Sequence, residues 1–172
     1  MSNSTDPNHQ SAPMTLSEAV GVLERERSAA EQYAVILDRF GKNDASRYVQ
    51  GISRYAEAKA DFDGLIEALK TEIIQHQDPM KSPKFGAALQ AAAEKRIAFT
   101  AFVTDQIVGD KEGARTLLYD VIRVVPDLIK KLTESGIAVW HEFRDAGKVR
   151  RDQILDQLDH LKWKAFADIA KT

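Results

Sequence analysis

The chain has 172 residues, which is enough for one domain with a hydrophobic core. Its share of apolar residues, 44%, and of charged residues, 29%, is typical of a globular protein. The formal net charge of −2 argues against a general attraction to nucleic acid or to an anionic membrane. The absence of cysteine excludes disulfide scaffolds, thiolate metal sites and cysteine nucleophiles. Without a signal-peptide pattern or a membrane-spanning apolar run, we expect a cytoplasmic protein.

Residues 1–14 are rich in serine, asparagine and proline, so we expect a disordered tail followed by one domain over 15–172. Thr15 and Glu18 form a capping box that predicts a helix start. Apolar residues then recur every three or four positions up to Phe40, on one helical face: Leu16, Val20, Leu23, Ala30, Ala34 and Leu37. This spacing predicts the first long helix.

Asn43 or Asp44 can cap a second helix, which we expect to run to about His76, before Pro79. Its apolar stripe consists of Tyr48, Ile52, Tyr55, Phe62, Ile66, Leu69 and Ile73. Ser82-Pro83 is a typical helix start, serine as the cap and proline in the first turn. The third helix should carry Phe85, Leu89, Ala92, Phe99, Val103 and Ile107 on its buried face and end at Gly109.

A fourth apolar stripe predicts a helix over about 112–135, kinked at Pro126 because proline lacks the backbone N–H. Ser135-Gly136 is a second position at which we expect the helix to be interrupted. From Ile137 a last helical region extends to about 170, and a polar stretch over 144–153 leaves its continuity open. Short connections favour antiparallel neighbours. The sequence therefore predicts an all-α, up-and-down antiparallel bundle of four to five long helices, with a long C-terminal helical region.

No motif in the sequence indicates catalysis or a cofactor. The Glu-x-x-His pairs of di-iron bundles are absent, and His141-Glu142 begins a zinc-protease motif that has Asp145 in place of the second histidine. The two glycine-rich nucleotide-binding motifs, G-x-G-x-x-G and G-x-x-x-x-G-K-[ST], are both absent from the sequence. We therefore expect no metal, no cofactor and no catalytic residues.

Three cations interrupt the apolar stripes: Arg27, Lys59 and Arg96. Up-and-down folding would bring Arg27 and Lys59 to similar heights, with Asp120 of the fourth helix near the same level. One interpretation is a polar layer or an anion-binding cleft, because buried cations need partners. The other, which we prefer, is that the long side chains reach solvent from the edge of the stripe.

The C-terminal region mixes basic residues with aspartates, which disfavours a membrane-surface helix or a phosphate-binding face. Its aromatic residues are candidate interface anchors, although core packing is the default interpretation: Trp140, Phe143, Trp163 and Phe166. The sequence thus favours a non-enzymatic interaction or scaffold module that contacts a protein partner or a second copy of itself. The alternatives are a membrane-surface module of the BAR kind and a bundle that binds a small anion or ligand; no nucleic acid is expected.

Overall fold

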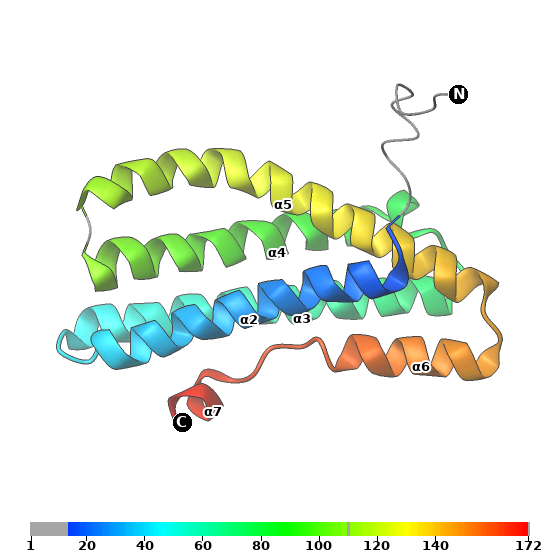
Figure 1. The fold of residues 1–172 in the computed structure, drawn as a ribbon, viewed down its shortest axis with the longest axis horizontal. Coiled ribbons are helices and arrows are strands. Elements are labelled where there is room, and N and C mark those ends of the chain that lie inside the picture. The colour runs from blue at the N-terminus through cyan, green and yellow to red at the C-terminus, as the bar shows by residue number, and fades with distance from the viewer. Residues whose placement is uncertain (1–13, 110, 172) are drawn as a thin grey trace.

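The fold is an antiparallel helical bundle, as the sequence predicts. Our computed structural model describes residues 14–109 and 111–171, without the side chains of 111–123. Over these residues the chain is helical and contains no strand. Four long helices run alternately in opposite directions (Figure 1): α2 (Leu16–Phe40), α3 (Ala45–Ile74), α4 (Pro83–Phe102) and α5 (Lys111–Asp145). A 3-10 turn, Pro79–Lys81, precedes α4.

The helix starts follow the predicted caps. The Thr15 hydroxyl accepts from the Glu18 N–H at 3.1 Å, and the Glu18 carboxylate accepts from the Thr15 N–H at 2.9 Å. Asp44 caps α3 and Ser82 caps α4, each accepting a backbone N–H three residues on. Met14, which the sequence assigns to the tail, instead packs against the core.

The third helix changes character before its expected end. After Phe102 the chain continues as a π-helical segment, η3 (Val103–Val108), which stops at Gly109 in the left-handed conformation with φ 79°. The hydroxyls of Thr100 and Thr104 donate to carbonyls four residues earlier, at 3.2 and 3.0 Å. Such bonds compete with the regular backbone pattern and are typical of distorted helices.

The break expected at 135–136 was wrong, because α5 continues to Asp145. The Ser135 hydroxyl donates to the Lys131 carbonyl at 2.8 Å within the helix. Gly136 serves packing rather than termination, since a Cβ there would lie 2.9 Å from Cζ of Phe85. Pro126 lies inside α5, and Figure 1 shows this helix bending along its course.

The C-terminal region is not one helix. Helix α6 covers Lys148–Asp159 and α7 covers Phe166–Ala170; residues 160–165, which we call the linker, join them without regular secondary structure. Helix α6 packs on α3 and α5, whereas α7 packs on α2 and α3. Apolar side chains of all three segments belong to the core: Ile154, Leu158, Leu161, Trp163 and Ile169. In the described ranges no helix is long and apolar enough to span a membrane.

Candidate functional site

Arg96 is the stripe cation that the structure buries. It is 8% exposed, and its Nε lies 3.1 Å from Glu26 Oε1 on α2. The two side chains form an ion pair, but the Nε–H group does not have the geometry of a hydrogen bond. Its Nη1 donates to the hydroxyl of Thr100. The guanidinium is thus paired within the α2–α4 contact, as a buried cation requires.

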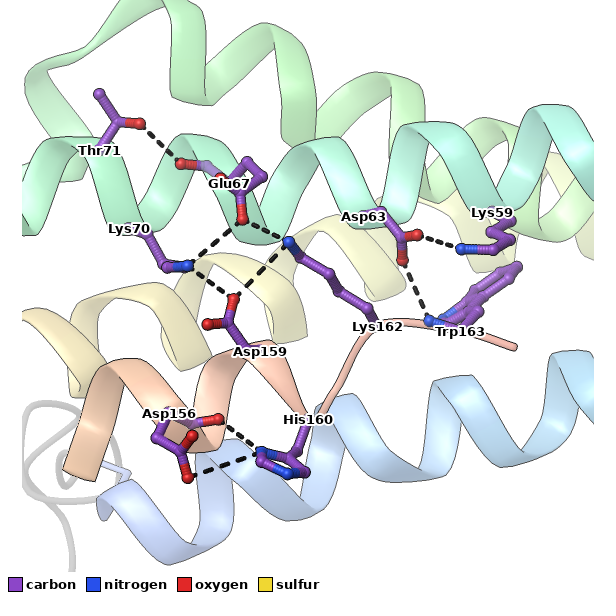
Figure 2. Close-up of polar contacts among 10 residues, drawn as sticks. All are labelled: Lys59, Asp63, Glu67, Lys70, Thr71, Asp156, Asp159, His160, Lys162 and Trp163. Carbon is purple, nitrogen blue, oxygen red and sulfur yellow. Dashed lines mark hydrogen bonds and ion pairs between the residues drawn. The ribbon is translucent and has the colours of Figure 1, made fainter. Parts of the chain in front are cut away.

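Arg27 and Lys59 face a different part of the molecule. The Arg27 guanidinium donates to the backbone carbonyl of His160. The Lys59 ammonium donates to Asp63 Oδ2 one turn further along α3, as Figure 2 shows. Arg27, Lys59 and Arg96 therefore each have a separate partner among the described residues. The side chain of Asp120 lies outside the described residues.

The backbone of the linker is bonded by side chains of α2 and α3. Asp63 Oδ1 accepts from the Trp163 N–H at 3.1 Å, and Glu31 Oε2 accepts from the Lys164 N–H at 3.0 Å. The Tyr55 hydroxyl donates to the Lys164 carbonyl at 2.7 Å. Together with the bond from Arg27 to His160, these contacts satisfy donors and acceptors that a helix or sheet would otherwise pair.

An aromatic cluster holds the centre of the linker. The Trp163 ring stacks on Phe62, with centroids 5.0 Å apart and an interplanar angle of 27°. Tyr55 lies 5.8 Å from Trp163 and makes an edge contact with Phe166 at 6.0 Å. Trp163 is 3% exposed, yet its indole N–H is buried without a partner among the described atoms. Burial, followed by the charges of Glu31 and Asp63, raises the pKa of the Tyr55 hydroxyl, which therefore remains a donor.

Lys162 of the linker and three charged residues beside it form what we call the ionic rim: Glu67, Lys70, Asp159 and Lys162 (Figure 2). Lys162 donates to Glu67, and Lys70 lies 2.6 Å from Asp159 and 3.4 Å from Glu67. The bond from Lys162 holds the pKa of Glu67 below its usual value, and the bond from Lys70 does the same for the pKa of Asp159. Both carboxylates are about half exposed, so each pair contributes little by itself.

The linker-binding face comprises the side chains of α2 and α3 that contact the linker: Arg27, Glu31, Tyr55, Phe62, Asp63 and Glu67. It combines an aromatic seat with carboxylates that accept backbone N–H groups. In this chain the arrangement binds the backbone of the linker at Trp163 and Lys164 and the ring of Trp163. It contains no nucleophile paired with a general base, and no group of three metal-ligating side chains occurs in the part of the chain that is described.

The four aromatic interface candidates are used inside the molecule. Trp140 and Phe143 of α5 are 8% and 4% exposed. The Arg151 guanidinium stacks over the Phe143 ring, 4.9 Å from its centroid, and donates through Nε to the Phe143 carbonyl at 2.8 Å. Trp163 is buried and Phe166 half-buried against α3.

Sequence reasoning missed the carboxylates of this face, Glu31, Asp63 and Glu67. Their spacing on α2 and α3 resembles that of ordinary solvent-exposed charges. The partners of Asp63 and Glu31 lie 100 and 133 residues further along the chain. No local signal pointed to them, because the residues that they bond lie in a turn at 160–162 and the irregular stretch that follows it.

Comparison with known proteins adds no assignment: no family model, curated protein or solved structure matches this chain.

Proposed function

We propose that the chain is a non-enzymatic protein-interaction module and that its binding surface is the linker-binding face. The observation that carries the proposal is the set of side-chain bonds to the backbone at His160, Trp163 and Lys164. Main-chain recognition gives affinity for an extended segment, while a pocket for one side chain gives specificity. The stacking of Trp163 on Phe62 supplies such a side-chain anchor.

The charge pattern gives less support to the alternatives. Lys59, Lys70 and Lys162 each pair with a carboxylate of the same surface, so this face offers no run of free cations to anionic lipid. Arg27 and Arg96 are engaged by a carbonyl and a carboxylate, which leaves neither poised for a small anion. An interaction module agrees better with both observations.

The proposal is tested by binding in trans. A fluorescent peptide with the sequence of residues 157–171 is titrated into the full chain carrying Trp163→Ala and into the unmodified chain. We expect saturable binding to the variant, at least about tenfold tighter than to the unmodified chain, because the intact linker competes for the same face. The matched control is Val149→Ala, an exposed position on α6 that should behave as the unmodified chain does. If the peptide does not bind the Trp163→Ala variant, the proposal is wrong.

A further inference from the structure

The linker fits its binding face incompletely. The indole N–H of Trp163 has no partner among the described atoms, a condition that disfavours the docked state. Beside the linker, a surface cavity of about 190 Å³ remains between α2 and α7, lined by Glu31, Gln32, Lys164 and Asp168 among others. The docked segment thus leaves a donor of its own tryptophan unmet, and its Lys164 and Asp168 help to line an open cavity beside it.

The charges around this face are selective for one kind of segment. The acceptors that meet the linker are all carboxylates: Glu31, Asp63 and Glu67. Two of them take backbone N–H groups, and the third pairs with the lysine immediately before the tryptophan. An acidic residue at that position would lose this pair and be repelled by Glu67, whose remaining partner would be Lys70 at 3.4 Å.

The docked segment is also held less firmly than the bundle helices. The linker and α7 together bury Leu161, Trp163 and Ile169, whereas α3 alone buries a longer set of large apolar side chains: Tyr55, Phe62, Leu65, Ile66, Leu69 and Ile73. Segments with few buried apolar contacts open at lower free energy than the core does. We therefore expect the linker to leave its face at a lower free energy than the unfolding of α2 to α5 requires.

From these three observations we propose that the linker-binding face receives an extended segment of another protein in which a basic residue directly precedes an aromatic one. The chain's own Lys162-Trp163 is the built-in competitor for this site. This inference rests on the proposed function and adds to it the class of partner and its control by the linker.

The test compares three labelled peptides on the full chain carrying Trp163→Ala. The first has the sequence of residues 157–171, the second has glutamate in place of Lys162, and the third has alanine in place of Trp163. We expect the second to bind about fivefold more weakly at low salt, a difference that shrinks at high salt, and the third to bind at least about tenfold more weakly. Adding Glu67→Lys to the protein should restore binding of the second peptide, which a merely structural role of Glu67 would not do.

Each outcome separates the two ideas. If the first and second peptides bind equally at low salt, or Glu67→Lys fails to restore binding of the second, the basic-aromatic partner is refuted while the interaction module stands. If no peptide binds, both proposals fail. Light scattering on the unmodified chain tests whether a second copy of the chain occupies the face. We expect a monomer. A dimer that dissociates when Trp163→Ala is introduced would mean that two copies exchange linkers and that no foreign segment is the partner.

Discussion

Replacing Trp163 with alanine should release the linker from α2 and α3 while the bundle stays folded. A buried tryptophan removes about 150–250 Å² from water, which corresponds to about 4–6 kcal/mol at 25 cal/mol per Å². The partnerless indole N–H, present only in the unmodified chain, offsets about 1–3 kcal/mol of that gain. The net loss therefore spans about 1–5 kcal/mol, and its midpoint of about 3 kcal/mol should raise the population of the open linker by about 100-fold.

Hydrogen exchange read by mass spectrometry or NMR measures this opening directly. The amides of Trp163 and Lys164 donate to Asp63 and Glu31, so their protection should fall by the stated factor in the variant. Amides in the middle of α3 should keep the protection that they have in the unmodified chain. Slow exchange of the linker amides in the variant would refute the anchoring role of Trp163. A parallel loss of protection in α3 would refute the idea that the linker opens separately from the bundle.

Three further results are expected. Gly136→Ala should destabilise the fold by about 1–3 kcal/mol in chemical denaturation, because the new methyl group would meet the buried Phe85 ring. The control Gly64→Ala lies in open space on α3 and should stabilise the fold by about 0.5–1 kcal/mol. Equal effects of the two substitutions would contradict the packing of Gly136 against Phe85. Glu26→Gln should cost about 1–3 kcal/mol, because it leaves the buried Arg96 without its carboxylate, and an unchanged denaturation midpoint would show that the pair is dispensable. Acidification from about pH 6 to pH 3 should lower the protection factors of the linker amides. The pKa values of Glu67 and Asp159 are lower in the folded protein than in the unfolded chain, where they are about 4, so their stabilising contribution is present above about pH 4 and is lost as the pH falls through the folded pKa values. Protection factors that rise on acidification would contradict this sign.

The long helices could be predicted because their signals are local. The capping box at Thr15, the caps at Asp44 and Ser82 and the three-to-four spacing of apolar residues specify start, length and buried face within one helix. Each of these features depends on neighbours no more than four positions away, which a sequence displays directly.

Gly136 shows where local reasoning stops. Serine followed by glycine suggests a helix end, but the glycine is required by the ring of Phe85, which lies on α4. The same limit applies to Arg27. Its stripe position identified it as unusual, whereas its partner, the His160 carbonyl, was decided by where the linker crosses α2. Lys59, by contrast, pairs with Asp63 one turn along the same helix, which is a local contact.

Two aromatic residues near the candidate site could be singled out from the sequence alone. Trp163 and Phe166 could be named as aromatic anchors because aromatic residues are few and informative. The carboxylates that bond the linker could not, because nothing local distinguishes Asp63 from the other acidic residues of a solvated helix. A contact between residues 100 positions apart requires the tertiary arrangement.

The docking of the linker on α2 and α3 is the claim on which both proposals depend, and nuclear Overhauser spectroscopy tests it most directly. With the indole resonances assigned by comparison with Trp163→Phe, we predict cross-peaks from the Trp163 ring to the rings of Phe62 and Tyr55. A Trp163 indole with no cross-peak to either ring, and with the chemical shifts of an unfolded chain, would contradict it.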